Sequence, residues 1–177
     1  MNQEPASRRS AGAASGGFTL IELMTVVIVI AVLAAIAIPS YRAYAIRSHR
    51  TAAKGCLAQL SNYMERYYAT NMRYDQDMSA PPVHMSNTAF PQLDCTAHTP
   101  TYTFSFASAG ATFTGITTAM PVTAPNPNPG QAAYVLQAVP AGAQAADTQC
   151  KTLALDQTGA QGISTSATGT VQTCWQR

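Results

Sequence analysis

Apolar residues run almost without interruption from Phe18 to Ile38. As a helix with a rise of about 1.5 Å per residue, this segment is roughly 31 Å long, which matches the hydrocarbon core of a bilayer. Only Thr19, Glu22 and Thr25 interrupt the apolar character. The pattern predicts a membrane-spanning helix with one carboxylate, and a charge in such a place is costly enough to require a function.

A second helical half follows, over residues 40–70. Its apolar residues recur at intervals of three and four, which places them on one face of a helix. We expect this apolar stripe to pack against a sheet. With the apolar run, the whole helix would contain about 52 residues and extend about 80 Å. The stripe consists of Ala53, Leu57, Leu60, Met64 and Tyr67, whereas Arg50, Lys54, Gln59, Asn62 and Arg66 lie off it.

Pro39 stands at the junction of the two halves. A proline inside a helix removes one N–H donor and clashes with the carbonyl group four residues earlier, here that of Ala35. Because the helical period resumes directly after Pro39, the sequence predicts a kink at this residue rather than the end of the helix.

The rest of the chain alternates between strand patterns and turn signals. Residues 70–100 have no clear period and contain several prolines, so we predict an irregular loop. After this loop, Tyr102, Phe104 and Phe106 alternate on one face of a strand over 101–106. A long helix followed by antiparallel strands is an α+β arrangement. The further predicted elements are strands at 111–118, 133–139 and 152–156, a proline-rich connection at 121–130, a hairpin turn at 157–160 and a short final stretch at 171–175.

Charge and composition narrow the function. At 177 residues, the chain accommodates one globular domain and an anchor. Its net charge of +2 is too small to indicate a nucleic-acid or anionic substrate, and we predict no specific nucleic-acid partner.

Basic residues cluster after the apolar run, at Arg42, Arg47, Arg50 and Lys54. By the positive-inside rule alone, they would place that end of the helix in the cytoplasm. These residues could contact lipid headgroups, acidic neighbours or nothing specific, and we favour subunit packing or solvation.

No catalytic, metal or cofactor site is predicted. The three histidines are scattered without metal-ligand spacing. Asp75 and Asp77, with Asp94 nearby, are interpreted as solvated turn residues rather than a calcium site, because the pattern of a calcium-binding loop is absent. The sequence also lacks the G-x-S-x-G motif of serine hydrolases.

Four cysteines allow three disulfide pairings: Cys56, Cys95, Cys150 and Cys174. They lack the C-x-x-C and histidine spacing of a zinc site, so we favour structural disulfides. Because disulfides persist in oxidising compartments, the cysteines indicate a head domain outside the cytoplasm.

The segment from Gly17 to Leu23, reading GFTLIEL, together with the apolar run to Pro39, closely resembles the N-terminus of type IV pilins. The resemblance implies that residues 1–17 form a leader, which carries an Arg8-Arg9 pair. A prepilin peptidase would cleave after Gly17 and N-methylate Phe18. A twin-arginine export signal is disfavoured, because such signals have a milder apolar core followed by a cleavage site.

The same resemblance implies a role in assembly for Glu22, together with Thr19 and Pro39. Cleavage would create a cationic amine on Phe18, about one helical turn from Glu22. In a filament, Glu22 of one subunit could then neutralise the amine of a neighbouring subunit. The alternative is that Glu22 lies at the headgroup boundary and has no function.

The resemblance implies a pilin-like α+β fold, with the long helix packed on an antiparallel meander. The chain would consist of the leader at 1–17, a transmembrane and assembly half of the helix at 18–39, an amphipathic half at 40–70 and a globular head at 71–177. Among the three cysteine pairings we favour Cys56–Cys95, which would join the loop to the helix, and Cys150–Cys174, which would enclose the C-terminal loop as in type IV pilins. The stretch 54–68 and the ending at 174–175 are most similar to PilE-type minor pilins.

By this resemblance, the chain is a structural subunit of a type IV pilus, and more specifically a minor pilin that enters or primes the filament and serves assembly, twitching motility or adhesion. Its partners would be other pilin subunits, the prepilin peptidase and the inner-membrane assembly machinery. The head would be periplasmic while the helix is anchored in the inner membrane, and at the cell surface afterwards. The alternatives are a pseudopilin of a type II secretion system and a membrane-tethered adhesion domain or enzyme that never polymerises. The position of Glu22 argues against the last of these.

Overall fold

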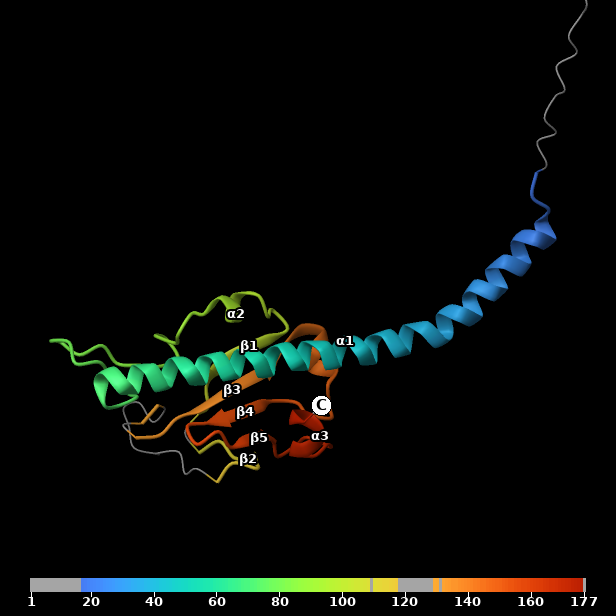
Figure 1. The fold of residues 1–177 in the computed structure, drawn as a ribbon. Coiled ribbons are helices and arrows are strands. Elements are labelled where there is room, and N and C mark those ends of the chain that lie inside the picture. Colours follow the sequence, from blue (N-terminus) through green and yellow to red (C-terminus); the bar gives the residue numbers. More distant parts are fainter. Residues whose placement is uncertain (1–16, 109, 118–128, 131, 177) are drawn as a thin grey trace, which may run out of the picture. The chain divides into compact units, whose positions relative to one another are not determined.

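The computed structural model describes residues 17–108, 110–117, 129–130 and 132–176 (Figure 1). The predicted leader up to Gly16, with its Arg8-Arg9 pair, Thr118 at the end of a predicted strand, and most of the proline-rich connection lie outside the described residues. The chain divides into two compact units, Met1–Arg42 and Ala43–Arg177, and each is considered by itself.

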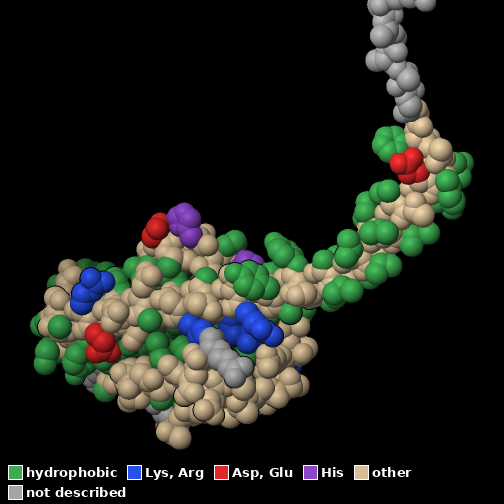
Figure 2. Space-filling model, turned by 45° about the vertical axis from the view of Figure 1, so that its right-hand side comes forward, with side chains coloured by type: hydrophobic (Ala, Val, Ile, Leu, Met, Phe, Trp, Pro, Cys, Tyr) green, Lys and Arg blue, Asp and Glu red, His purple; other side chains and the backbone are tan. Residues whose placement is uncertain are grey.

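Helix α1 (Leu20–Asn71) contains 52 residues and continues through Pro39, so the proline does not end it. The predicted helix over both halves of this segment is therefore confirmed. In the first unit, apolar side chains are exposed and form the surface of the helix (Figure 2). In the second unit, four members of the predicted apolar stripe are fully buried, namely Ala53, Leu57, Leu60 and Met64, and Tyr67 is partly buried.

Five strands form one antiparallel sheet in the order β1-β3-β4-β5-β2, which confirms the predicted α+β class. The stripe of α1 packs on one face of this sheet. The order differs from the expected meander, because β2 lies at the far edge and pairs with β5. The strands are β1 (Tyr102–Phe106), β2 (Phe113–Thr114), β3 (Val135–Pro140), β4 (Leu153–Asp156) and β5 (Gln161–Ser164).

Small residues explain the position of β2. A Cβ atom at Gly162 of β5 would lie only 2.8 Å from the Ile116 side chain and 3.1 Å from Phe113, so glycine there allows the segment around β2 to pack closely. Phe113 and Ile116 cover a second small cluster, formed by Ala107, Val135 and Ala154. Because both faces of the sheet are covered, all four residues of β4 are buried.

The predicted hairpin turn at 157–160 joins β4 to β5. Asp156 lies at its start, and its Oδ1 accepts hydrogen bonds from the backbone N–H groups of Thr158 at 2.9 Å and Ala160 at 2.8 Å. Gly159 has a φ of +81°, a left-handed conformation that glycine adopts without steric cost. The turn is thus specified by local residues.

Three short helical elements complete the head: α2 (Asp94–Ala97), a 3₁₀ helix η1 (Gly142–Ala146) and α3 (Val171–Trp175). The final stretch predicted at 171–175 is therefore a helix. Its start is fixed by a capping box, in which Thr170 Oγ1 accepts from the backbone N–H of Thr173 at 3.2 Å and Thr173 Oγ1 accepts from that of Thr170 at 3.1 Å.

The loop between α1 and the sheet is pinned to the outer edge of β1. Asn87 Oδ1 accepts a hydrogen bond from the backbone N–H of Phe106 at 2.7 Å, and Asn87 Nδ2 donates to the Phe106 carbonyl at 3.3 Å. At the other end of β1, the backbone N–H of Tyr102 donates to the Thr99 carbonyl at 3.1 Å. The irregular loop predicted at 70–100 thus packs on the sheet.

Candidate functional site

The residues predicted to be processed lie at the exposed N-terminal end of α1. The Phe18 side chain is 83% exposed. Among the described residues, no atom beyond the chain neighbours of Gly17 lies within 4 Å of the position that a Cβ atom would take there. The described residues thus leave the backbone at Gly17 uncovered.

Thr19 caps the start of α1. Its Oγ1 accepts a hydrogen bond from the backbone N–H of Glu22 at 3.3 Å, which satisfies one of the first-turn donors that have no helical partner. Glu22 stands at the third helical position, where a carboxylate completes the Thr-x-x-Glu spacing of a capping box and interacts favourably with the helix dipole. The motif therefore gives Glu22 a helix-stabilising role beside the predicted assembly role.

Helix α1 is long and apolar enough to cross a membrane, and its most apolar window is not buried inside the protein. A signal sequence near an N-terminus meets the same criteria of length and composition. Length and composition therefore do not distinguish a lasting membrane anchor from a signal sequence. This distinction rests on the motif that contains Glu22 and on the head.

On the head, Arg50 of α1 forms a buried ion pair with Asp147. The Arg50 Nη2 atom donates to both carboxylate oxygens at 2.8 Å, and Nε donates to Oδ2 at 3.1 Å. The two side chains are only 7% and 1% exposed. Asp147 Oδ1 also accepts a hydrogen bond from the backbone N–H of Cys150 at 3.2 Å. The interpretation of Arg50 as a residue of subunit packing or solvation is therefore wrong, because it joins α1 to the C-terminal region of the same chain.

The helical period contains a signal for this pair. Arg50 lies three residues before Ala53, so it is on the apolar stripe rather than off it. A buried arginine requires an acidic partner. The identity of that partner could not be read from the sequence, because Asp147 is 97 residues away.

Two further contacts hold α1 against the same region. The buried Gln144 side chain donates through Nε2 to a backbone carbonyl of α1 at 3.2 Å and to the Tyr102 hydroxyl at 3.0 Å. Lys54 Nζ donates to the Trp175 carbonyl at 3.2 Å. Burial, and then the nearby charge of Arg50, lower the pKa of Lys54 from its ordinary value. Members of the basic cluster therefore have internal partners.

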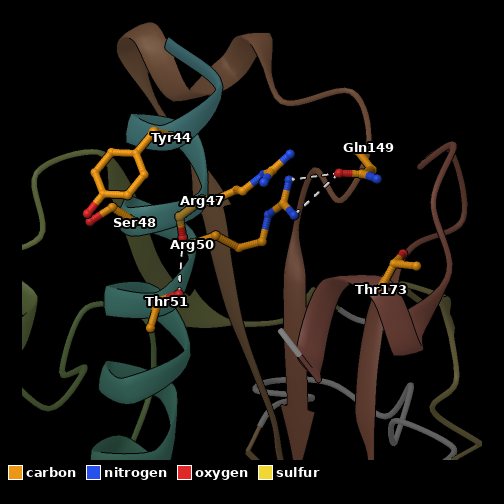
Figure 3. A pocket seen from close by; sticks show the side chains of 7 residues that line it. All are labelled: Tyr44, Arg47, Ser48, Arg50, Thr51, Gln149 and Thr173. Carbon is orange, nitrogen blue, oxygen red and sulfur yellow. Dashed lines mark hydrogen bonds between the residues drawn. The ribbon is translucent and has the colours of Figure 1, made fainter. Parts of the chain in front are cut away.

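A groove of about 590 Å³ lies beside the Arg50–Asp147 pair, between α1 and the C-terminal loops (Figure 3). Arg50 Nη1 and Nη2 donate to Gln149 Oε1 at 3.4 Å, and in Figure 3 the amide nitrogen of Gln149 points away from Arg50. Figure 2 shows Lys and Arg side chains gathered in one region of this face of the head. Two arginines and, among the described residues, no carboxylate line the groove, so it favours an anion. The lining residues are Tyr44, Arg47, Ser48, Arg50, Thr51, Gln149 and Thr173.

A second polar network surrounds Glu65 of α1. Its carboxylate accepts hydrogen bonds from the hydroxyl groups of Tyr74 at 3.1 Å and Tyr134 at 3.0 Å. Burial, and then the bond to Glu65, raise the pKa of Tyr74 to about 12, and burial also raises the pKa of Tyr134. Both hydroxyls therefore remain neutral donors at physiological pH, which suits a structural role. The groove of about 540 Å³ beside this network contains both signs of charge, and is lined by Gln59, Asn62, Glu65, Arg66 and Leu93.

The loop aspartates have local partners. Asp75 pairs with Arg73 at 2.6 Å, and this bond lowers the pKa of Asp75. Asp77 Oδ1 accepts from the Ser79 hydroxyl at 2.6 Å and from the Val83 backbone N–H at 2.8 Å, and these bonds lower its pKa. Within the described part of the chain, no group of three or more His, Cys, Asp or Glu side chains is placed to hold a metal ion.

Two disulfides join separate parts of the head. Cys56 of α1 is bonded to Cys95 of α2, and Cys150, just before β4, is bonded to Cys174 of α3. Their Cα atoms are 5.5 and 5.7 Å apart, within the usual range. The structure thus contains the same two pairs that we favoured from the sequence.

Comparison with known proteins divides the chain at Pro39. Residues 13–38 match the prokaryotic N-terminal methylation motif. Residues 39–154, about two thirds of the chain, match the family described as type IV minor pilin ComP, DNA uptake sequence receptor. The segment that contains Glu22 therefore matches a methylation motif, and most of the rest of the chain matches a minor-pilin family.

Individual relatives are similar over shorter stretches. The chain is 45% identical over 58 residues to the type IV major pilin protein PilA of Myxococcus xanthus, a match that covers 33% of this chain and 26% of the relative. It is 39% identical over 64 residues to the fimbrial protein EcpC of Eikenella corrodens (36% and 42%) and 53% identical over 45 residues to the type IV major alpha-pilin of Moraxella bovis (25% and 28%). The chain therefore matches less than half the length of each relative.

Proposed function

Because the chain belongs to the family of type IV minor pilins described as ComP, we propose that it is a minor structural subunit of a type IV pilus. The observation that carries this proposal is the arrangement of two matches in tandem, a methylation motif followed directly by a minor-pilin head. The family is one of structural pilins rather than of enzymes. The type IV pilin family that the sequence resembles is thus shown, and the ComP match supports the minor-pilin type.

Maturation would begin with cleavage after Gly17 by a prepilin peptidase and N-methylation of Phe18. The exposure of Phe18 and the open space at Gly17 support this step. Before assembly, α1 would anchor the chain in the inner membrane with the head in the periplasm. The two disulfides support the periplasmic side, because such bonds persist in an oxidising compartment.

Glu22 would then form the contact that selects the subunit for the filament. The substitution Glu22→Ala is expected to leave the protein in the membrane fraction but reduce its amount in sheared pili roughly tenfold or more, because an amine left unpaired among apolar helices costs several kcal/mol. Immunoblots of both fractions measure this effect.

Thr25→Ala is the matched control for Glu22→Ala. The Thr25 hydroxyl is also polar and lies in the same apolar segment, but it donates to carbonyl groups of its own helix, those of Ile21 at 3.0 Å and Glu22 at 2.9 Å. Incorporation should therefore be nearly unchanged. Equal amounts of Glu22→Ala and unmodified protein in sheared pili would contradict the proposed contact.

A deletion strain separates the pilus role from that of a secretion pseudopilin. We expect loss or reduction of twitching motility, pilus number or adhesion, with type II secretion unaffected. Normal pili and motility together with lost secretion would contradict the proposal.

A second candidate function is binding of DNA. It is favoured by the match to a family described as a DNA uptake sequence receptor, since that match covers the head rather than only the N-terminal motif. Full-length protein in detergent micelles is expected to bind duplex DNA, with an affinity that falls as salt rises, because phosphate contacts release counterions. Fluorescence anisotropy tests this expectation, and the absence of binding at low salt would exclude this second function.

A further inference from the structure

The groove beside Arg50 contains a cation that the folded head does not use. Within the described part of the chain, the guanidinium of Arg47 and the hydroxyl of Ser48 have no hydrogen-bond or ion-pair partner, whereas Arg50 is neutralised by Asp147. The groove therefore offers one free positive charge, and a charge-assisted hydrogen bond from an arginine is a contact that suits a phosphate group.

The groove lies close along α1 to the end of the apolar run, and this position favours an anion at a membrane surface. Tyr44 and Arg47 lie six and nine residues after Ile38, the last residue of the apolar run, which corresponds to roughly 9 and 14 Å of helix. The headgroup layer of a bilayer extends about 5–8 Å beyond each side of the hydrocarbon core. Helical side chains tilt toward the N-terminus of their helix, here toward the apolar run, and a long arginine side chain can reach back to the interface.

Exposed aromatic residues mark the same segment. Tyr41 and Tyr44 are 73% and 71% exposed. Tyrosine is enriched at membrane–water interfaces, where its ring contacts the acyl boundary and its hydroxyl remains hydrated. Tyr44 lines the basic groove and follows the apolar run by six residues, which favours a lipid headgroup over a free anion.

We propose that, in the membrane-anchored precursor, the groove beside Arg47 binds the phosphate of an anionic phospholipid headgroup. Arg47 donates charge-assisted hydrogen bonds to the phosphate oxygens. This inference rests on the membrane-anchored state proposed above, and it is independent of the Glu22 contact.

The test uses the full-length chain in dodecyl maltoside micelles and follows the backbone amide NMR signals of Gln149 and Thr173. These residues line the groove but come from a part of the chain distant in sequence from α1, so their signals report on binding in the groove. Dihexanoyl-phosphatidylglycerol is expected to shift both signals and to saturate at a concentration several-fold below that of the zwitterionic dihexanoyl-phosphatidylcholine. Inorganic phosphate and a short DNA duplex form two further arms.

Variants connect the shifts to the groove. Arg47→Gln is expected to raise the half-saturating lipid concentration roughly fivefold, because the charged donor of the groove is lost, and Arg47→Lys should keep most of the affinity. Arg42→Gln is the matched control, because Arg42 is exposed on the same helix but does not line the groove. It should leave the titration unchanged.

Four outcomes would overturn the inference: absence of shifts, equal weakening by Arg42→Gln, saturation by inorganic phosphate at the same concentration as by the lipid, or tighter saturation by DNA. The proposed pilus function is tested separately. A variant that no longer binds lipid but still enters pili leaves that function intact, whereas a chain that never enters the membrane would remove the basis of both.

Discussion

The substitution Arg50→Met is expected to lower the free energy of unfolding of the head by about 3–5 kcal/mol, the usual cost of breaking a buried ion pair from one side. Asp147 would lose its cationic partner at a position where its side chain is 1% exposed. Its remaining bond to the Cys150 backbone does not replace the three hydrogen bonds from Arg50.

Urea unfolding of the full chain in micelles measures this loss. Trp175 is the single tryptophan of the chain, and its Nε1 atom donates to the Gly162 carbonyl at 3.0 Å, so its fluorescence reports directly on the folded head. Arg42→Met, which removes an exposed arginine from the same helix, should change stability by no more than about 0.5 kcal/mol.

The double variant Arg50→Met/Asp147→Leu sharpens the test. Replacing both partners of a buried pair by apolar residues is often neutral or even stabilising. We therefore expect the double variant to recover most of the stability lost by Arg50→Met. If Arg50→Met alone had a negligible effect, the ion pair would not be buried in solution as it is in the structure.

Replacing Cys150 and Cys174 together by serine is expected to lower stability by about 2–5 kcal/mol. The bridge closes a loop of sequence separation 24, for which the chain-entropy account predicts about 3.5 kcal/mol. Both bridge residues also hold α3 in place, whose Trp175 carbonyl accepts from Lys54 of α1. Loss of this bridge should therefore reduce the order of the C-terminal segment.

The same unfolding measurement, made in parallel with Cys56→Ser/Cys95→Ser, separates the two bridges. That pair joins α1 to α2 and leaves α3 bonded. We expect both double variants to be destabilised, but only the first to expose Trp175 in the folded state. Non-reducing peptide mapping of the unmodified chain should recover Cys56 with Cys95 and Cys150 with Cys174, and a Cys56–Cys174 peptide would contradict the structure.

The helix and its buried face could be predicted from the sequence, because a period of 3.6 residues is a local property. The intervals between Ala53, Leu57, Leu60 and Met64 require no knowledge of the rest of the chain. The same period places Arg50 on the buried face, although its charge by itself favours subunit packing or solvation. Its partner lies far along the chain, so no local pattern could have named it.

The sheet was predictable strand by strand but not in its order. Alternation locates β1, β3 and β4 within one or two residues, and Asp156 and Gly159 specify the turn that leads into β5. The position of β2 depends on close packing between Gly162 and Ile116, which are distant in sequence. A strand of two residues carries too little alternation to reveal which edge it joins.

The candidate sites also differ in whether their residues are contiguous in the sequence. The GFTLIEL motif at Gly17 to Leu23 is contiguous, so the processing and assembly residues were open to prediction from the sequence. The basic groove combines Arg47 of α1 with Gln149 and Thr173 of the C-terminal loops. Because these residues come together only in the folded head, the sequence showed a basic cluster without showing the groove.

The contacts of Asn87 and Thr99 with β1 have a consequence for how copies of this chain can associate. They occupy backbone groups at both ends of β1, and the opposite edge of the sheet is the two-residue strand β2. An open edge strand is the usual starting point of uncontrolled cross-β aggregation, and occupied or very short edges suppress it. Many heads can therefore be crowded together without their sheets fusing.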